Sequence, residues 1–182
     1  MEGGINSWKG LRAEGLPEAG MAYFSAATRA EELIALAWYL EKGSQTFYSE
    51  ISQRLTDKVA KDLFKELAIA EEHHQTSLAR LYQESSGLTS ASKFPESVIP
   101  PPEKGEIMEG GMRVAEALDW AKGKEVRDIL ELAVSLETNA YDLHLRMRQR
   151  MKEEKSQEVF ALLSEEERDH LERLSSLLEE RI

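Results

Sequence analysis

The chain has 182 residues, of which 41% are hydrophobic and 31% charged, a balance typical of a soluble globular protein of about one domain. Its formal net charge of -11 at pH 7 argues against a nucleic-acid partner or an anionic membrane partner. Because the chain contains no cysteine, disulfides and thiolate-ligated iron–sulfur or rubredoxin-type centres are excluded within it. Any metal ion must therefore be bound by oxygen and imidazole ligands.

Hydropathy along the chain excludes a membrane span. The longest apolar run, Leu33 to Leu40, is too short to cross a bilayer, and no signal peptide is recognisable at the start of the sequence. We therefore expect a cytoplasmic protein.

The first 22 residues form an arm that differs from the rest of the chain. It contains the sequence GGINSWKG at residues 3–10 and GLP at residues 15–17. This resembles the closing stretch of a rhodanese-like domain, which ends in a GG-x-x-x-W-x-G pattern followed by G-x-P. The resemblance implies that a sulfur-transfer domain precedes this chain in a longer protein; the alternative is an ordinary N-terminal arm. We divide the chain into this arm, residues 1–22, and a helical domain, residues 23–182.

The helical domain begins with two long stretches in which apolar residues recur every three or four positions, the spacing of amphipathic helices. The first helix is predicted from about residue 28 to 54, with a capping box over residues 28–31. The second is expected to begin at a cap on Thr56 or Asp57 and to end at Gly87. The turn between them is very short, which predicts an antiparallel hairpin.

The segment over residues 88–111 is rich in proline and glycine, so we expect no regular helix there. A short helix over residues 112–122, a long one over 125–152 and another from 156 to the C-terminus follow. Two helical hairpins joined by one long connection predict an all-α fold, the ferritin-like four-helix bundle. An interdomain linker is the alternative interpretation of the proline-rich segment.

Two of the four histidines follow a glutamate by three positions: His74 follows Glu71, and His170 follows Glu167. Positions i and i+3 of a helix lie on the same face, so each pair offers a carboxylate and an imidazole to one point in space. His73, next to a candidate ligand, is expected to face solvent.

Each of the two remaining long helices carries a glutamate within apolar sequence, Glu41 and Glu137. A carboxylate is rarely buried unless a counter-charge or a metal compensates for its lost hydration. Several buried glutamates would therefore require cations. The alternative for these residues is a solvent-facing acidic surface with accidental histidines.

The spacing of these residues indicates an internal duplication, because 137 minus 41, 167 minus 71 and 170 minus 74 all equal 96. The same offset aligns apolar residues of the two halves, such as Phe64 with Phe160. A bundle with pseudo-twofold symmetry would bring all six candidates to its centre.

The ordered set resembles a rubrerythrin-like member of the ferritin-like superfamily over about residues 28–182. The matching motifs are Glu41 followed by Phe47-Tyr48, LAxxExxH ending at His74, Glu137, and LSxxExxH ending at His170. The resemblance implies two metal ions held by a glutamate from each of two helices and a Glu-x-x-His pair from each of the others. Bridging ligands would be Glu71 and Glu167, and terminal ligands Glu41 and Glu137. An oxygen-rich shell with two imidazoles suits iron, or alternatively manganese.

Tyr48 and His144 lie two helical turns after Glu41 and Glu137 respectively. Either could hydrogen-bond a metal ligand or a bound peroxide, although core packing is the common role of such residues. The sequence departs from rubrerythrin at Val134, where that family places a further carboxylate implicated in its peroxidase cycle. The rubredoxin domain that feeds electrons to such sites is also absent, since there is no cysteine.

These observations favour a di-iron oxidoreductase, of the peroxidase or oxidase type, that reacts with hydrogen peroxide or dioxygen in oxidative-stress defence. Its electrons would come from an external rubredoxin-like protein or from iron(II). One alternative is a ferroxidase or iron-handling protein, for which iron(II) is the substrate. The other is a non-catalytic helical interaction module stabilised by metal. Hairpin pairs of this size often dimerise, so we expect a homodimer.

Overall fold

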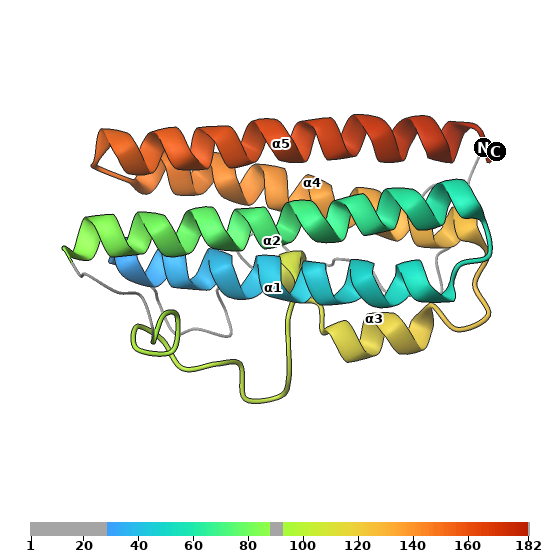
Figure 1. Cartoon of the computed structure of the whole chain (residues 1–182), viewed down its shortest axis with the longest axis horizontal. Coiled ribbons are helices and arrows are strands. Elements are labelled where there is room, and N and C mark those ends of the chain that lie inside the picture. The colour runs from blue at the N-terminus through green and yellow to red at the C-terminus, as the bar shows by residue number, and fades with distance from the viewer. Residues whose placement is uncertain (1–28, 88–92, 182) are drawn as a thin grey trace, which may run out of the picture.

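The computed structural model describes residues 29–87 and 93–181, and this part of the chain is helical without a β-strand. The long helices of this part of the chain run alongside one another (Figure 1). They are α1 (Ala30–Arg54), α2 (Lys58–Ser86), α4 (Val126–Arg150) and α5 (Glu154–Glu179), accompanied by the 3-10 turn η3 (Glu109–Gly111) and the short α3 (Val114–Trp120). The predicted all-α, ferritin-like bundle is confirmed. The arm at residues 1–22, with its rhodanese-like pattern, lies outside the described residues.

The helix ends agree with the local chemistry except at the start of α1. Asp57 caps α2, where its side chain accepts a hydrogen bond from the Ala60 main-chain N–H at 2.9 Å, and Gly87 ends α2 with a φ of +66°. The capping box predicted over residues 28–31 is wrong, because the N-cap of α1 is Arg29. The Glu32 carboxylate accepts a hydrogen bond from the Arg29 main-chain N–H at 3.2 Å, so the box lies one residue later.

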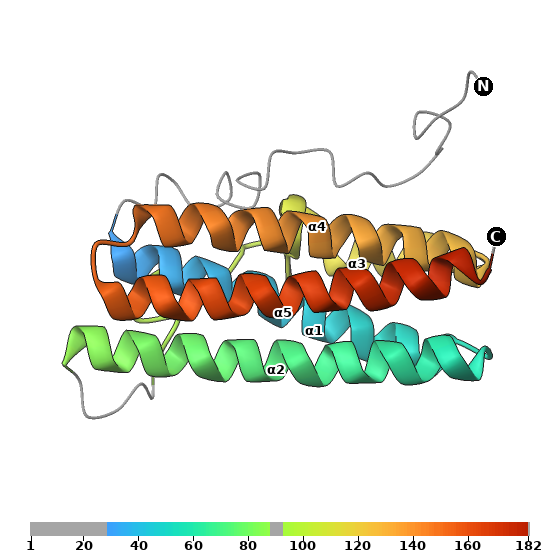
Figure 2. The same cartoon turned by 90° about the horizontal axis from the view of Figure 1, so that it is seen from above.

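The two hairpins repeat with the offset found in the sequence. Adding 96 to residues 30 and 54, the bounds of α1, gives residues 126 and 150, the bounds of α4. The first residue of α2, at 58, becomes 154 in the same way, the first residue of α5. Helix α5 thus begins two residues before its predicted start. Within each hairpin the two helices pack along their length, and the hairpins meet through α2 with α5 and α1 with α4 (Figure 2).

The second part of the crossover between the hairpins, which includes η3 and α3, packs against α1. Ile107 and Met108 are fully buried, and Figure 1 shows η3 and α3 beside α1. A Cβ atom built on Gly43 of α1 would lie 2.0 Å from the Ile107 carbonyl oxygen. Only glycine therefore allows the crossover to approach the helix so closely.

Two apolar clusters fill the bundle, and each of the long helices contributes to both. One cluster contains Phe47, Phe64 and Leu132, and the other contains Leu36 and Leu81. The buried glutamates and histidines fall between the two clusters along the helices. Within the described ranges, no helix has the length and apolar character needed to cross a membrane.

Candidate metal centre

The structure brings the six predicted ligands together in the middle of the bundle. All six side chains are buried, the most exposed being His170 at 7%. They form two overlapping groups, in each of which the potential ligand atoms lie within 4.8 Å of one another. One group is Glu41, Glu71, His74 and Glu167, and the other is Glu71, Glu137, Glu167 and His170. Two glutamates, one from each hairpin, therefore belong to both groups.

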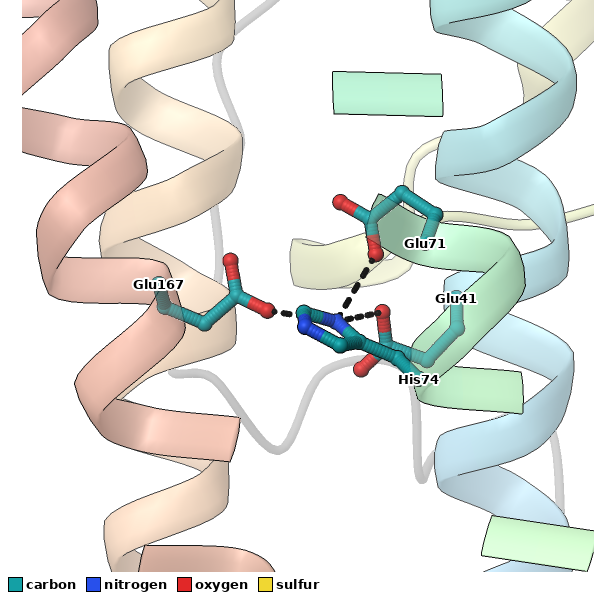
Figure 3. Close-up of side chains that lie close together, drawn as sticks. All are labelled: Glu41, Glu71, His74 and Glu167. Atoms are coloured by element: carbon teal, nitrogen blue, oxygen red, sulfur yellow. Dashed lines mark hydrogen bonds and ion pairs between the residues drawn. The ribbon is translucent and has the colours of Figure 1, made fainter. Parts of the chain in front are cut away.

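The first group surrounds the imidazole of His74, as Figure 3 shows. Its Nδ1 atom lies 3.3 Å from Glu41 Oε2, 3.2 Å from Glu71 Oε2 and 3.0 Å from Glu167 Oε1. These carboxylates come from α1, α2 and α5. One nitrogen thus faces oxygens from three helices.

The second group repeats this pattern around His170. Its Nδ1 atom lies 3.2 Å from Glu137 Oε2 and 3.2 Å from Glu167 Oε2. The two oxygens of Glu167 therefore face the two different histidines, Oε1 toward His74 and Oε2 toward His170. A carboxylate in this position is suited to bridge two cations.

A further carboxylate orients His74 from outside the two groups. The Nε2 atom of His74 lies 2.7 Å from Glu166 Oε2. Because an ionised carboxylate only accepts hydrogen bonds, Nε2 donates to Glu166, and Nδ1 is the nitrogen that faces the carboxylates of the first group. Metal-binding histidines are commonly oriented by such a carboxylate. The position equivalent to Glu166 in the first half, 96 residues earlier, is Ala70.

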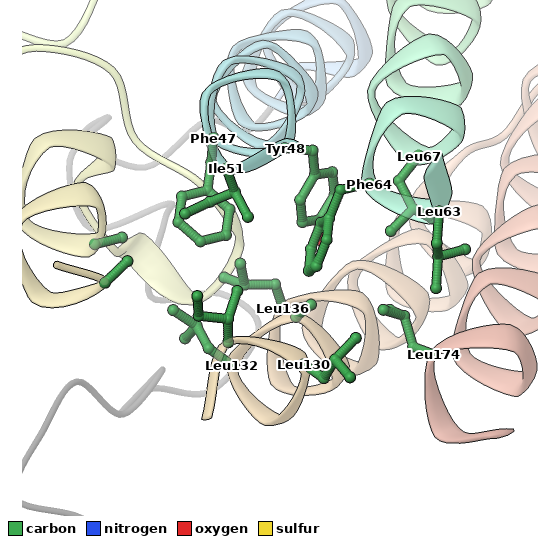
Figure 4. Packing of buried hydrophobic residues seen from close by; sticks show 14 of the residues in the cluster. Phe47, Tyr48, Ile51, Leu63, Phe64, Leu67, Leu130, Leu132, Leu136 and Leu174 are labelled. Carbon is green, nitrogen blue, oxygen red and sulfur yellow. The ribbon is translucent and has the colours of Figure 1, made fainter. Parts of the chain in front are cut away.

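Tyr48 and His144 both reach across the bundle to a glutamate of the opposite hairpin. The Tyr48 hydroxyl donates to Glu137 Oε1 at 2.5 Å, and His144 Nε2 lies 2.8 Å from Glu41 Oε1. The Tyr48 ring also packs on Phe64, with ring centroids 5.7 Å apart (Figure 4). The phenol thus combines core packing with a contact to a candidate ligand.

The carboxylates of the metal-free centre influence one another's ionisation. Burial raises the pKa of Glu71 well above its usual range, and the charges of Glu41 and Glu167 raise it further. Burial likewise raises the pKa of Glu137, to which the charge of Glu167 adds. Burial also opposes ionisation of Glu167, but hydrogen bonds from Glu137 and the surrounding histidines outweigh burial and lower its pKa. Some of these carboxylates therefore ionise readily while their neighbours hold protons.

The buried histidines bind protons tightly in the same surroundings. Burial alone would lower the pKa of His170, but hydrogen bonds to Glu137 and Glu167 outweigh it and raise the pKa to about 10. The pKa of His144 rises to about 9, because its contacts with Glu167 and Glu41 outweigh burial. A divalent cation entering this centre must displace such protons, so metal affinity is expected to rise with pH.

The donor set fits a pair of metal ions. Within the described part of the chain, Glu41 Oε1, Glu71 Oε2 and Glu167 Oε1 are buried without a hydrogen-bond partner. Leaving buried carboxylate oxygens in this state is costly unless a cation compensates. Four carboxylates and two imidazoles form a mixed oxygen and nitrogen shell of the kind that binds iron or manganese.

Sequence reasoning missed one buried carboxylate near the centre, Glu109 of η3. It is 2% exposed and accepts a hydrogen bond from the Ser44 hydroxyl of α1. Burial and the charge of Glu41 raise its pKa to about 8, although the bond from Ser44 opposes this. Glu109 stands in a glycine-rich loop where no periodicity marks an inward side chain. The one sequence feature that could have indicated burial of this segment is the apolar pair Ile107-Met108 before it.

An all-helical bundle with buried glutamates and histidines that could hold a metal ion is typical of the ferritin-like class of proteins. Comparisons with known proteins agree with this class. Residues 14–82, which include α1 and most of α2, match the family model described as Rubrerythrin. The match begins inside the predicted arm.

The solved structure of a hypothetical protein from Pyrococcus furiosus is similar to nearly the whole chain. The two share 25% sequence identity with a TM-score of 0.63, and the alignment covers 91% of this chain and 95% of that chain. None of the curated proteins matches this chain. The similarity to the Pyrococcus protein thus extends over both hairpins.

Proposed function

We propose that this protein is a rubrerythrin-like, non-haem di-iron protein that reduces hydrogen peroxide or dioxygen. The observation that carries the proposal is the pair of overlapping groups of buried glutamates and histidines that share Glu71 and Glu167. The Rubrerythrin match over residues 14–82 supports the same assignment.

The ligands divide naturally between two ions. Glu41 and His74 would hold one ion, and Glu137 and His170 the other, with Glu71 and Glu167 between them. Four carboxylates would balance the charge of two divalent cations. Iron is the first choice for this oxygen-rich shell and manganese the second.

A diferrous pair supplies two electrons, which together with two protons convert hydrogen peroxide into two molecules of water. The chain contributes the surroundings for this chemistry. Apolar clusters on both sides of the ligands exclude water from the centre. The Tyr48 hydroxyl holds a proton against Glu137 Oε1, and its burial raises the pKa of Tyr48 well above that of a free phenol, so the proton is retained at neutral pH.

Electrons must come from outside this chain after each turnover, because a sequence without cysteine has no rubredoxin-type centre. We propose a separate rubredoxin-like protein as the donor, or iron(II) itself. In the second case the iron would be the substrate of a ferroxidase, and it would leave the centre after oxidation.

Single-turnover kinetics test this proposal. The diferrous protein is mixed with hydrogen peroxide, and in parallel with dioxygen, in a stopped-flow spectrometer. We expect rapid oxidation of both irons in the wild-type protein and in the exposed-site control Glu165→Gln, and none above the rate of free iron(II) in Glu167→Gln. Equal, slow rates in all three proteins would contradict a redox role. Measuring the iron that remains bound after desalting separates the peroxidase (iron retained) from the ferroxidase (iron released).

A further inference from the structure

His144 is a buried histidine of α4 that belongs to neither of the two ligand groups. It is 1% exposed, and its Nε2 atom points at the centre, 2.8 Å from Glu41 Oε1 and 3.7 Å from Glu167 Oε1. An imidazole in this position can either donate a hydrogen bond or bind a metal ion with the same nitrogen.

The equivalent residue in the first half shows which of these two roles the geometry favours. His144 lies 96 residues after Tyr48, and both side chains approach the Oε1 atom of a glutamate in the opposite hairpin. Tyr48 forms a hydrogen bond there. His144 does not form one of suitable angle: among the described residues neither ring nitrogen makes a well-directed hydrogen bond, although Nε2 lies 2.8 Å from Glu41 Oε1. The same is true of Glu41 Oε1 and Glu167 Oε1, the two oxygens nearest to Nε2.

These unsatisfied atoms face one another across the first ligand group. Glu41 presents Oε2 to His74 Nδ1 at 3.3 Å and Oε1 to His144 Nε2 at 2.8 Å. Glu167 Oε1 lies 3.0 Å from His74 Nδ1 and 3.7 Å from His144 Nε2. Metal–ligand bonds of about 2.0–2.2 Å place neighbouring ligand atoms roughly 3–4 Å apart. Two imidazole nitrogens thus flank two carboxylates at distances suitable for sharing one cation.

We propose that His144 Nε2 is a further metal ligand and that it makes the two metal positions unequal. The position at Glu41 would carry two imidazoles, from His74 and His144, whereas the position at Glu137 would carry one, from His170, with the Tyr48 phenol beside it. This inference rests on the proposed metal pair. Nitrogen-rich sites favour iron(II) over manganese(II) and bind the later metals of the series more tightly. The position at Glu41 would therefore fill first.

Nitrogen-15 NMR of the zinc-loaded protein provides the first test, with zinc(II) as a diamagnetic probe. The chain has only four histidines, and the exposed His73 serves as the reference for an unbound imidazole. We expect metal-bound signals from three nitrogens: Nδ1 of His74, Nδ1 of His170 and Nε2 of His144. Metal-bound signals from His74 and His170 alone would overturn the inference about His144 and leave the proposed metal pair intact. No metal-bound signal from any histidine would overturn both.

Stepwise titration with iron(II) under anaerobic conditions provides the second test. Wild-type protein should show two binding steps of different affinity. The variant His144→Tyr carries a tyrosine at this position, as the first half does at Tyr48. Its iron(II) affinity in the tighter step should fall by about tenfold or more, and the weaker step should be unchanged. The metal-free melting temperature controls for folding. Two steps unchanged from the wild type in a folded His144→Tyr would contradict the proposal.

Discussion

The hairpins α1–α2 and α4–α5 offer the same candidate ligands in different surroundings. Each supplies one glutamate from its first helix and a Glu-x-x-His pair from its second, and each places Nδ1 of its histidine toward the carboxylates. The residues around these ligands differ between the halves: Tyr48 corresponds to His144, Ala70 to Glu166, and Ser44 to Ala140. The duplicated halves thus keep the same candidate ligands while the contacts around them have diverged.

The divergence is concentrated on the Glu41 side of the centre. His74 there is held by Glu166, and the crossover brings Glu109 onto Ser44 of α1. Gly43, which admits the crossover, corresponds to Asn139 in the second half. A duplicated bundle can therefore give its two proposed metal positions different surroundings without changing the candidate ligands that its halves have in common.

The largest effect is expected at Glu167, the carboxylate whose two oxygens face both histidines. Glutamine offers one neutral oxygen and cannot bind metal ions at both proposed positions. Glu167→Gln should therefore lower the metal affinity of both positions, by more than the roughly 10–100-fold that is typical when a residue that hydrogen-bonds a ligand is replaced. Glu137→Gln should lose only one ion. Metal content after anaerobic loading and desalting measures this, with Glu165→Gln as the control. Two ions retained by Glu167→Gln would contradict a shared ligand.

Gly43→Ala should destabilise the protein at a contact that distinguishes the two halves, the close approach of the crossover to α1. The added Cβ would collide with the Ile107 carbonyl oxygen, and overpacking of this kind costs about 1–3 kcal/mol or more. Urea unfolding of the metal-free protein measures the loss. Asn139→Ala, at the equivalent position of the second half, should change the free energy of unfolding by less than about 0.5 kcal/mol. Equal effects of the two variants would show that the crossover does not press on α1.

Glu109→Gln should change the pH dependence of stability in the metal-free protein. The pKa of Glu109 is raised to about 8 from its usual 4.5, so the folded state holds this proton more tightly than the unfolded state. The free energy of unfolding of the wild type therefore decreases as the pH rises from 4.5 through 8. The total decrease is about 1.4 kcal/mol for each unit by which the pKa of Glu109 differs between the folded and the unfolded state.

Glutamine does not titrate, so the stability of Glu109→Gln relative to the wild type should increase over this pH range and then level off. Urea unfolding at a series of pH values measures the difference. The exposed Glu106→Gln serves as control and should follow the wild-type curve. A constant difference between Glu109→Gln and the wild type from pH 5 to 9 would refute the assigned protonation.

Tyr48→Phe should have the smallest effect of the four. It removes the hydrogen bond to Glu137 Oε1 and leaves that oxygen unsatisfied, at a cost of about 1–3 kcal/mol. Thermal unfolding of the metal-free protein measures this cost. The half-buried Tyr141 of α4 supplies the matched control, Tyr141→Phe, which should remain near wild-type stability. If the two variants melt alike, the phenol of Tyr48 contributes only packing.

Much of this arrangement was accessible from sequence, because it depends on periodicity. Helical spacing predicted the four long helices, and the offset of 96 residues between Glu41 and Glu137 predicted that the hairpins would be equivalent. A glutamate within an apolar stripe has to point inward, which is why Glu41 and Glu137 could be expected beside the Glu-x-x-His pairs.

The contacts that sequence reasoning missed depend on tertiary packing. Glu109 reaches the interior from a loop, and Glu166 resembles any other acid on an exposed helix face until α5 is placed against α2. The start of α1 was missed for a local reason: Arg29 with Glu32 forms the box, although Thr28 is the better N-cap residue by preference. None of these features follows a period that could be recognised in advance.

The central claim is that the buried carboxylates and imidazoles hold two metal ions between the hairpins. Anomalous scattering at the iron and manganese edges, collected from crystals of the protein as isolated, tests it most directly. We predict two peaks, one between Glu41 and His74 and the other between Glu137 and His170, with Glu71 and Glu167 between them and the iron edge giving the stronger signal. Crystals with ordered side chains and no peak within bonding distance of these residues would contradict the account.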